Sequence, residues 1–286
     1  MKVLVTGVKG QLGYDVVAEL AKRGHTPIGV DIEEMDITDE AAVARTVSEV
    51  APDAVIHCAA WTAVDAAEDA ENVDKVRAVN AKGTANLANA CKTQGCKMMY
   101  ISTDYVFDGQ GTEPWQPDCK DYAPLSVYGQ TKLEGELAVS ETLEQYFIVR
   151  IAWVFGINGK NFIKTMLGLS DKYETLRVVS DQIGTPTYTY DLARLLVDMI
   201  VTDQYGYYHA TNEGGYISWA EFAEEIFRQA GKATKVIPVT TAEYGVSKAK
   251  RPFNSRLDKS KLTACGFEPL PTWQDALARY LKELEK

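Results

Sequence analysis

The sequence predicts an α/β fold in which helices cover both faces of a doubly wound parallel sheet. From residue 2 to residue 156, short apolar runs typical of buried strands alternate with amphipathic stretches of helical periodicity. After residue 157 the alternation is less regular, which indicates a smaller second lobe. We therefore expect a sheet domain over residues 1–156 and a C-terminal lobe over residues 157–286, with some segments of the lobe returning to the sheet domain.

The individual elements are predicted from their boundaries. Clusters of glycine, proline and aspartate separate the apolar runs, and capping residues precede the helical stretches. Strands are expected at residues 2–6, 26–30, 53–58, 97–102, 146–151 and 176–179. Helices are expected at residues 14–23, 40–50, 71–93, 125–139, 190–201, 219–229 and 273–284, with a further helix beginning near Asn161.

Composition and charge exclude several classes of protein. The 286 residues are 46% hydrophobic, with a mean hydropathy of −0.20, as expected for a soluble globular chain with a sizeable core. A formal charge of −10 argues against a surface for nucleic acid or anionic membranes, because phosphates attract basic faces. No apolar run is long enough for a membrane span or signal peptide, so we expect a cytoplasmic protein. The five scattered cysteines favour reduced thiols over disulfides or a zinc site.

A glycine-rich turn follows the first predicted strand. Glycines 7, 10 and 13 stand between Lys2–Thr6 and the amphipathic stretch at residues 14–23. Glycine permits a tight turn and a close approach of pyrophosphate to the backbone, and the free N–H groups of the following helix favour phosphate. The pattern is typical of a Rossmann-like dinucleotide-binding fold, although a glycine-rich turn can also be only a turn.

Acidic residues after the second predicted strand bear on the choice of cofactor. Asp31 lies eighteen residues beyond the last glycine of the turn, near the spacing expected for a carboxylate on the adenosine ribose. Because no arginine follows it, Asp31 favours NADH over NADPH, unless a basic side chain reaches the ribose from elsewhere. Asp36 and Ile37 are placed to flank an adenine, but a simple capping turn explains them equally well.

Later predicted strands end at the same edge of the sheet. The strand at residues 53–58 leads into a loop of small residues from Ala59, and the strand at residues 97–102 leads into Thr103. The carboxyl ends of parallel strands meet at one edge, where ligands collect in open α/β sheets. We therefore expect the glycine turn, Asp31, the Ala59 loop and Thr103 to form one rim. His57 lies inside an apolar strand and is expected to be a core residue.

A tyrosine and a lysine share the helix predicted at residues 125–139. Tyr128 and Lys132 are four residues apart, so both side chains project from one face of that helix. Their ordinary pKa values of roughly 10 and 10.4 make neither one suited to proton transfer at neutral pH. A lysine cation near a phenol favours the phenolate, so we expect Lys132 to lower the pKa of Tyr128. The spacing also arises by coincidence, and its meaning depends on the surrounding residues.

Two further segments are candidates for contact with a ligand. Residues 105–124 are rich in glycine, proline, aspartate and aromatic residues, which suits either a loop that closes over a ligand or a plain connection. Between residues 248 and 261, six basic residues stand against one acid. In so acidic a chain this cluster is a candidate phosphate clamp, with Arg251 and Arg256 best suited to bidentate contacts. A solvated charged surface is the alternative.

Several strings in the sequence resemble a known family. The three glycines, Ser102-Thr103-Asp104 and Tyr128-x-x-x-Lys132 are together similar to the extended short-chain dehydrogenase/reductase superfamily, whose members mostly act on nucleotide sugars. More narrowly, strings spread over residues 1 to about 258 resemble the dTDP-4-dehydrorhamnose reductase family. These strings are Gly10-Gln-Leu-Gly13, Ala60-Trp-Thr-Ala-Val-Asp65, Ser102-Thr-Asp-Tyr-Val-Phe107, Val127-Tyr-Gly-Gln-Thr-Lys132, Asn161-Phe-Ile-Lys-Thr-Met166, Asp181-Gln-Ile-Gly-Thr-Pro-Thr187 and Arg251-Pro-Phe-Asn-Ser-Arg256.

The resemblance implies reduction of the C4 ketone of dTDP-4-dehydro-L-rhamnose to dTDP-L-rhamnose, a precursor of cell-surface polysaccharides, with NADPH or NADH as hydride donor. It implies that Tyr128 protonates the nascent alkoxide and that Lys132 binds the nicotinamide ribose and tunes Tyr128. Thr103, which stands where many superfamily members have serine, would hydrogen-bond the substrate carbonyl.

The resemblance also assigns binding residues. Besides Tyr128 and Lys132, the residues that would bind the cofactor are Gly7, Gly10, Gln11, Leu12, Gly13, Asp31, Asp36, Ile37, Ala60, Trp61 and Thr62. The residues that would bind the substrate are Thr103, Asp104 and Trp153 at the sugar and Lys164, Gln182, Arg251 and Arg256 at the nucleotide diphosphate. The lobe at residues 157–286 would be mainly substrate-binding.

Two other readings remain open. A nucleotide-sugar epimerase or dehydratase shares the tyrosine and lysine but keeps its NAD bound and recycles the hydride. A non-catalytic nucleotide-binding regulatory subunit would use the fold without turnover. Because Thr103, Tyr128 and Lys132 are all present, we favour the reductase. The expected partner is a small-molecule nucleotide sugar and the expected assembly is a monomer or homodimer; Mg²⁺ would follow from the resemblance alone, since the residues predict no metal site.

Overall fold

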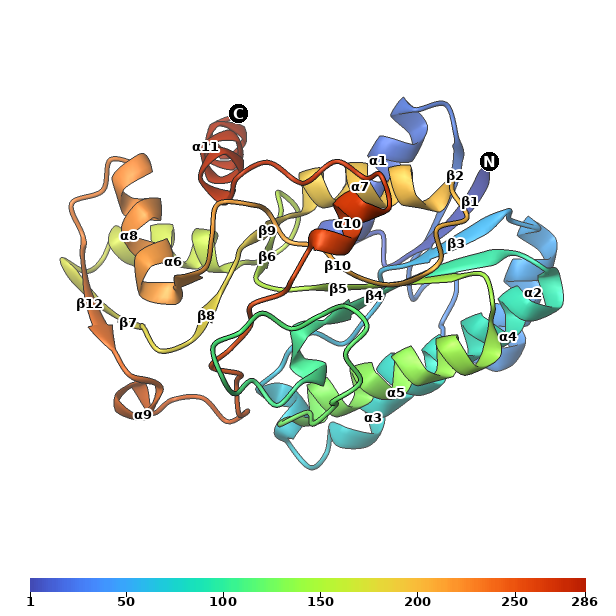
Figure 1. Cartoon of the computed structure of the whole chain (residues 1–286), viewed down its shortest axis with the longest axis horizontal. Coiled ribbons are helices and arrows are strands. Elements are labelled where there is room, and N and C mark those ends of the chain that lie inside the picture. The colour runs from blue at the N-terminus through green and yellow to red at the C-terminus, as the bar shows by residue number, and fades with distance from the viewer.

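A six-stranded parallel sheet forms the centre of the computed structural model, which describes residues 1–286 (Figure 1). Its strand order is β10-β5-β4-β3-β1-β2, and every neighbouring pair is parallel. The strands are β1 (Lys2–Thr6), β2 (Thr26–Val30), β3 (Ala54–His57), β4 (Lys97–Thr103), β5 (Tyr146–Ile151) and β10 (Gly206–His209). The predicted parallel α/β sheet is confirmed, and β10 joins it at one edge from the second half of the chain.

Helices cover the sheet on both faces because successive side chains of each strand point to opposite sides. Val3 and Val5 of β1 enter one apolar core, and Leu4 enters the other. The first core is completed by α1 (Gln11–Lys22) and α7 (Thr189–Ile200). The second core is completed by α2 (Glu40–Val50), α4 (Thr84–Gln94) and α5 (Val127–Thr142), which lie below the sheet in Figure 1.

The helix predicted at residues 71–93 is interrupted. It consists of α3 (Val73–Arg77), a π-helical segment (Ala78–Gly83) and α4. The π segment carries Asn80, whose side chain accepts a hydrogen bond from the Trp61 amide and donates to the Thr131 hydroxyl. Such π segments are frequent at functional sites. Here the segment fastens the loop after β3 to helix α5.

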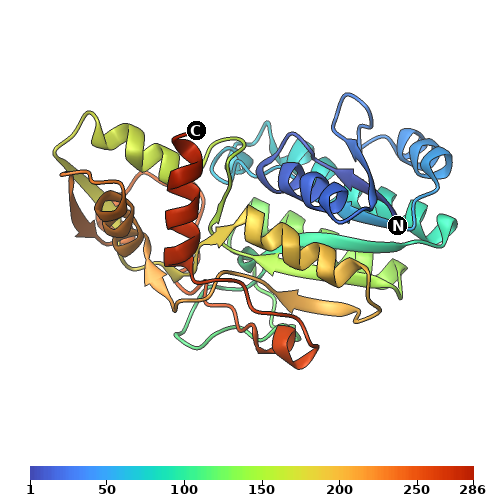
Figure 2. The same cartoon turned by 90° about the horizontal axis from the view of Figure 1, so that it is seen from above.

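The smaller lobe has its own apolar core. The core is built from α6 (Phe162–Ser170), α8 (Trp219–Gln229) and α11 (Trp273–Leu284), beside the parallel pair β7 (Thr175–Val179) and β12 (Lys235–Val239). In Figure 2, α11 stands between this lobe and the sheet. The remaining short elements are β6 (Val154–Phe155), β8 (Ile183–Gly184), β9 (Thr187–Tyr188), β11 (Ile217–Ser218), α9 (Thr241–Tyr244), α10 (Ser260–Ala264) and 3₁₀ turns at Ala66–Glu68 and Asp104–Val106.

Capping side chains set the starts of several helices. Asp39 caps α2 by accepting hydrogen bonds from the amides of Ala41 and Ala42. Ser126 and Asn161 cap α5 and α6, and Ser218 forms a reciprocal capping box with Glu221 at the start of α8. The predicted helix starts near residues 40, 161 and 218 are therefore confirmed.

A buried ion pair fastens the loop at residues 105–124 to the sheet. The Arg150 guanidinium and the Glu136 carboxylate lie 2.7 Å apart, and both side chains are fully buried. Arg150 also donates to the Pro117 carbonyl and the Tyr122 hydroxyl, and its guanidinium lies 4.9 Å from the Phe107 ring. Phe107 and Tyr122 belong to the loop, and their rings pack on the buried guanidinium, which favours the plain connection over a loop that closes over a ligand.

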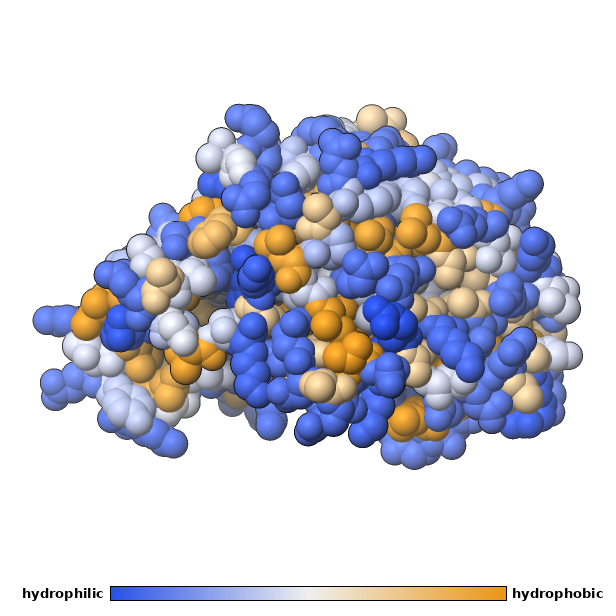
Figure 3. All heavy atoms as spheres, turned by 90° about the horizontal axis from the view of Figure 1, so that it is seen from below, coloured by the Kyte–Doolittle hydropathy of each residue, from blue (hydrophilic) through white to orange (hydrophobic).

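The surface carries mixed polarity. The face in Figure 3 is mostly hydrophilic, with hydrophobic residues in separate patches rather than one continuous surface. None of the helices is both long and apolar enough to span a bilayer. All five cysteines are free thiols.

Replacing Glu136 with glutamine tests the buried pair. The variant leaves the Arg150 cation without a counterion in the core, so we expect a loss of about 3 kcal/mol in the free energy of unfolding, measured by urea denaturation. Glu134→Gln is the matched control, because Glu134 pairs with Arg77 at the surface and its replacement should cost less than about 1 kcal/mol. Equal losses in the two variants would contradict the anchoring role of Glu136.

Candidate active site

A cavity of about 980 Å³ lies at the carboxyl edge of the sheet and extends to the smaller lobe. The structure brings the predicted rim together, since the glycine turn, Asp31, the Ala59 loop and Thr103 all line this cavity. The lining residues that the sequence had assigned to a cofactor are Gly7, Gly10, Gln11, Leu12, Gly13, Asp31, Asp36, Ile37, Ala60, Trp61, Thr62, Tyr128 and Lys132. The lobe contributes Trp219, and the chain entering it contributes Val154 and Lys160.

The glycine turn is sterically closed to other residues at two positions. Gly7 has φ of 70°, and a Cβ atom there would lie 2.7 Å from the backbone of Ala59. A Cβ atom at Gly13 would lie 2.3 Å from the Gly7 carbonyl oxygen. Gly10 is the N-cap of α1 and has no capping side chain, so the first N–H groups of the helix face the cavity without a competing acceptor. This arrangement suits a pyrophosphate.

The Asp31 carboxylate is held by the turn itself. It accepts hydrogen bonds from the amides of Lys9 and Ile32, both at 2.9 Å. The Lys9 ammonium lies 2.6 Å from the Glu33 carboxylate and lines the cavity beside Asp31. The sequence analysis missed Lys9, although it allowed for a basic side chain from elsewhere; its position inside the glycine turn was the available signal.

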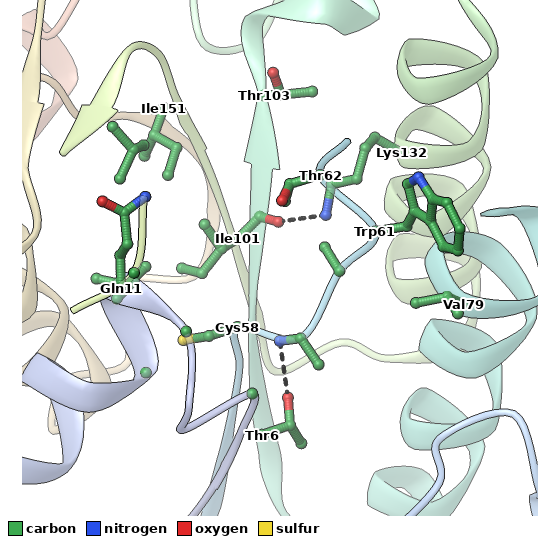
Figure 4. A pocket seen from close by; sticks show the side chains of 18 of the residues that line it. Thr6, Gln11, Cys58, Trp61, Thr62, Val79, Ile101, Thr103, Lys132 and Ile151 are labelled. Atoms are coloured by element: carbon green, nitrogen blue, oxygen red, sulfur yellow. Dashed lines mark hydrogen bonds between the residues drawn. The ribbon is translucent and has the colours of Figure 1, made fainter. Parts of the chain in front are cut away.

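The Lys132 ammonium is buried behind the cavity wall. It donates a 2.7 Å hydrogen bond to the Ile101 carbonyl, as Figure 4 shows, and lies 4.1 Å from the centre of the Tyr100 ring. The side chain is 2% exposed, and burial lowers the pKa of Lys132 to about 7. A small change in local charge therefore decides whether this group is an ammonium or a neutral amine at physiological pH.

Tyr128 lines the cavity one helical turn before Lys132. Burial raises the pKa of the Tyr128 hydroxyl above its ordinary value, and a hydrogen bond with Thr103 opposes that rise only in part. The prediction that Lys132 lowers the pKa of Tyr128 is therefore wrong: desolvation dominates, and the ammonium is directed at the Ile101 carbonyl. At neutral pH Tyr128 is a protonated phenol, which is the form that can donate a proton.

Ser102, Thr103 and Asp104 place three polar groups at the end of β4. The Thr103 hydroxyl donates to Asp104 Oδ1 at 3.0 Å and accepts from the Tyr105 amide. Asp104 is 2% exposed, and burial raises its pKa to about 6. Asp104 Oδ2 and the Ser102 hydroxyl have no hydrogen-bond partner. Both residues line the cavity, but these two atoms are themselves buried, so a ligand hydroxyl reaches them only if the side chains rotate.

Two stacked indoles form the far wall of the cavity. Trp153 has φ of 51°, an uncommon backbone conformation for a bulky residue. Its ring lies 3.7 Å from that of Trp219, with 16° between the planes. Trp153 was predicted to contact the sugar, whereas Trp219 was not among the predicted site residues. Strain of this kind is typical of ligand-binding sites.

The predicted diphosphate contacts are not gathered in the cavity. None of Lys164, Gln182, Arg251 and Arg256 lines it. The Lys164 ammonium donates to the carbonyls of Ile157 and Gly159, and Gln182 donates to Thr241. Arg256 donates to Asn254, and Arg251 donates to Asp65 and to the Tyr105 hydroxyl. The cations that line the cavity are Lys9, Lys132 and Lys160.

The basic cluster at residues 248–261 is distributed over separate ion pairs. Lys248 pairs with Asp69, Lys259 with Glu213 and Lys261 with Asp118. The solvated-surface interpretation therefore fits Lys248, whereas Lys259 and Lys261 are mostly buried and hold ion pairs of their own; the three lysines do not form a single clamp.

Other ionisable groups have structural surroundings. His57 is hydrogen-bonded to the hydroxyls of Thr6 and Thr84, and burial lowers its pKa to about 3, so it is the predicted core histidine. No three or more histidine, cysteine, aspartate or glutamate side chains come together in a way that could hold a metal ion. The Mg²⁺ implied by the resemblance is thus left without support.

Comparisons with known proteins agree over the full length of the chain. The family model described as the RmlD substrate binding domain matches residues 1–286. A dTDP-4-dehydrorhamnose reductase of Streptomyces griseus is 42% identical over 280 residues, covering 96% of this chain and 91% of the relative. The crystal structure of a dTDP-4-dehydrorhamnose reductase from Clostridium acetobutylicum is 42% identical, with a TM-score of 0.96 over 100% of both chains. A second, from Bacillus anthracis in complex with NADP, is 41% identical, with a TM-score of 0.94 over 99% of both chains.

Asp104→Asn tests the buried carboxyl. Because the pKa of Asp104 is raised in the folded protein, the folded state binds more protons than the unfolded state between about pH 4 and 6, and stability falls as pH rises through that window. Asparagine keeps the acceptor for Thr103 without the charge. We therefore expect the free energy of unfolding of the variant, relative to that of the wild type, to rise by about 2–3 kcal/mol from pH 4 to pH 8, as measured by urea denaturation.

The control for this experiment is Asp121→Asn, since Asp121 is exposed. Its stability relative to the wild type should stay constant over the same pH range. A constant difference for Asp104→Asn as well would show that Asp104 titrates normally.

Proposed function

Since the chain belongs to the RmlD substrate-binding-domain family and is similar to dTDP-4-dehydrorhamnose reductases over nearly its full length, we propose that it reduces the C4 ketone of dTDP-4-dehydro-L-rhamnose to dTDP-L-rhamnose. The chain is an NAD(P)H-dependent oxidoreductase of the short-chain dehydrogenase/reductase type. Its product is a nucleotide sugar used in polysaccharide synthesis, and its partner is the nucleotide-sugar substrate.

One observation carries the proposal. Thr103, Tyr128 and Lys132 line the same cavity as the glycine turn, and the turn leaves helix N–H groups free for a pyrophosphate. A cofactor seated on the turn therefore lies along the same cavity as a proton donor. A binding subunit has no need of this combination, and the family model matches the whole chain.

The proposed chemistry uses each side chain in a defined protonation state. A bound nicotinamide supplies the hydride to the C4 carbon. The protonated Tyr128 hydroxyl then gives its proton to the C4 oxygen. The single hydrogen of the Thr103 hydroxyl, which points at Asp104 in this structure, turns to the C4 oxygen when the substrate is bound. The phenolate left on Tyr128 is an anion in a buried site, where the Lys132 ammonium one turn away would stabilise it.

On the substrate side, we propose that Asp104 and Trp153 contact the sugar. Asp104 lines the cavity, and rotation of its carboxyl group would bring the unpaired, buried Oδ2 to a sugar hydroxyl as an acceptor. The Trp153 ring, backed by Trp219, offers a flat apolar surface. Two members of the predicted diphosphate set adjoin the cavity: Arg251 donates to Tyr105 and Lys164 donates to the Gly159 carbonyl, and both of these partners line it. Contacts of Lys164, Gln182 and Arg256 with the diphosphate remain predictions.

We also propose that residues 1–156 bind the cofactor and that residues 157–286 mainly bind the substrate. The cavity supports it: the glycine turn and Asp31 come from the first half, and Trp219 from the second. Two segments of the second half, α7 and β10, belong to the sheet domain. A monomer or homodimer remains the predicted assembly.

For the cofactor, we propose that NADPH is used as well as NADH. A relative of known structure holds NADP. In this chain the Lys9 ammonium lies beside Asp31, where the adenosine ribose is expected. The Asp31 carboxylate is occupied by the amides of Lys9 and Ile32. Lys9 would supply the positive charge that a 2′-phosphate requires by exchanging its exposed partner Glu33 for the phosphate.

Tyr128→Phe tests the proton donor. The wild-type protein should oxidise NADPH when dTDP-4-dehydro-L-rhamnose is added, followed by the loss of nicotinamide absorbance. The variant should lose at least about 100-fold in kcat while its Kd for NADPH is unchanged, because only the transferable proton is removed. Tyr173→Phe, on an exposed residue of the lobe, should behave like the wild type.

The same assay separates the alternatives. An epimerase or dehydratase would convert the sugar without net loss of NADPH, and a regulatory subunit would convert nothing. Either result with the wild-type protein would contradict the reductase assignment. Full activity of Tyr128→Phe would show that Tyr128 is not the proton donor.

Lys9→Ala tests the choice of cofactor. Loss of the cation should raise KM for NADPH about tenfold and leave KM for NADH within about twofold, which corresponds to one charge-assisted contact. Lys22→Ala, which removes an exposed lysine farther along α1, is the matched control. Equal effects of Lys9→Ala on both cofactors would contradict a role at the 2′-phosphate.

A further inference from the structure

A short segment from the lobe is bound to the sheet domain near the cavity. We call residues Ser247–Arg251 the strap; in Figure 1 this part of the chain follows α9 and runs back toward the sheet domain. Its anchor is Asp65, which comes directly after the cavity-lining residues Ala59–Val64 and had no role in the sequence analysis. The strap thus connects the loop beside the cofactor to the substrate-side lobe.

One carboxylate makes most of this connection. Asp65 Oδ1 accepts hydrogen bonds from the Ser247 hydroxyl and from the amides of Lys248 and Ala249, at 3.0, 3.1 and 3.0 Å. Asp65 Oδ2 accepts from Arg251 Nη2 at 2.5 Å. A carboxylate with four donors, two of them consecutive backbone amides, holds a defined geometry that an ordinary surface ion pair does not.

The contacts continue from the strap to the proposed proton donor. Arg251 Nη1 donates to the Tyr105 hydroxyl at 3.2 Å. The Tyr105 ring lines the cavity and meets the Tyr128 ring edge-on, with 5.4 Å between centres and 81° between planes. A Cβ atom added at Gly129 would lie only 2.3 Å from the Tyr105 carbonyl oxygen. Tyr105 therefore packs directly on the first turn of α5.

We propose that Asp65 is a positioning residue for the proton transfer: by holding Arg251 on the Tyr105 hydroxyl, it fixes the ring of Tyr105 against Tyr128. Asp65 touches neither substrate nor cofactor in this role, and the role rests on the proposed function of Tyr128. Small displacements of a proton donor have large effects on rate, since misplacement by about 1 Å can cost about 100-fold. Binding of the strap to Asp65 would in this way affect the position of the Tyr128 hydroxyl.

The chain contains a matched control for a purely fastening role. Lys248 of the strap also pairs with Asp69, at 2.7 Å, on the same side of the sheet domain. This pair holds the strap but has no contact with Arg251 or Tyr105. Asp69→Asn therefore weakens strap attachment without touching the route to Tyr128.

The test compares Asp65→Asn, Tyr105→Phe and their combination, in the full-length protein with NADPH and dTDP-4-dehydro-L-rhamnose. Asparagine keeps Oδ1 as an acceptor and removes the Oδ2 partner of Arg251, while phenylalanine removes only the hydroxyl that Arg251 binds. We expect each single variant to lower kcat about tenfold, with the Kd for NADPH unchanged, and the double variant to be no slower than the slower single one. The kcat of Asp69→Asn should stay within twofold of the wild-type value. In the double variant of Asp69→Asn and Tyr105→Phe, the two changes in kcat should multiply.

Hydrogen exchange of the same variants gives a readout that does not depend on turnover. Asp65→Asn should speed amide exchange in the strap and also in residues 103–107 and 126–132, whereas Asp69→Asn should speed it in the strap alone. If the wild type leaves NADPH unchanged, the proposed function fails and exchange alone decides the role of Asp65. The role is overturned if Asp65→Asn keeps the wild-type kcat, or if the losses of kcat in Asp65→Asn and Tyr105→Phe multiply in the double variant. It is also overturned if the faster amide exchange of Asp65→Asn is confined to the strap.

Discussion

A parallel sheet covered on both faces leaves only its edges for polar chemistry, and this constraint decides where the cavity lies and which strand ends line it; helix α5 adds Tyr128 and Lys132. Val3, Val5 and Leu4 show the principle: adjacent residues of one strand enter two separate apolar cores. Polar side chains appear only where the strands end. The glycine turn follows β1, Asp31 follows β2 and Thr103 ends β4, so residues far apart in sequence meet along one cavity.

Burial sets the charge state of that cavity. It raises the pKa of Tyr128, raises the pKa of Asp104 to about 6 and lowers the pKa of Lys132 to about 7. All three shifts favour the uncharged forms, so the resting site suits a neutral ketone. Negative charge develops on the C4 oxygen during hydride transfer and then on Tyr128 after proton transfer. Thr103 and Lys132, which would stabilise these charges, already line the cavity.

The regular part of the fold could be predicted because each element carries its own signal. Strands β1, β2 and β5 and helices α2 and α11 have the bounds that their periodicity and caps predict. Strand β10 was missed because it has four residues and lies at the sheet edge, where its pattern is short. The pKa of Tyr128 was predicted in the wrong direction because a one-turn spacing shows which side chains are neighbours and says nothing of how deeply they are buried. Likewise the charge run at residues 248–261 resembled a clamp because its partners Asp65, Asp69, Asp118 and Glu213 are distant in sequence.

The place of β10 has a consequence for how the chain acquires its structure. β10 pairs with β5 across more than fifty intervening residues, and α7 completes the core on the face that α1 leaves half covered. A chain released after residue 156 would expose the backbone edge of β5 and one side of the sheet, both of which invite pairing with other chains. Residues 1–156 are therefore continuous in sequence but are not expected to fold as a unit, because the sixth strand of the sheet is complete only once residue 209 has been synthesised.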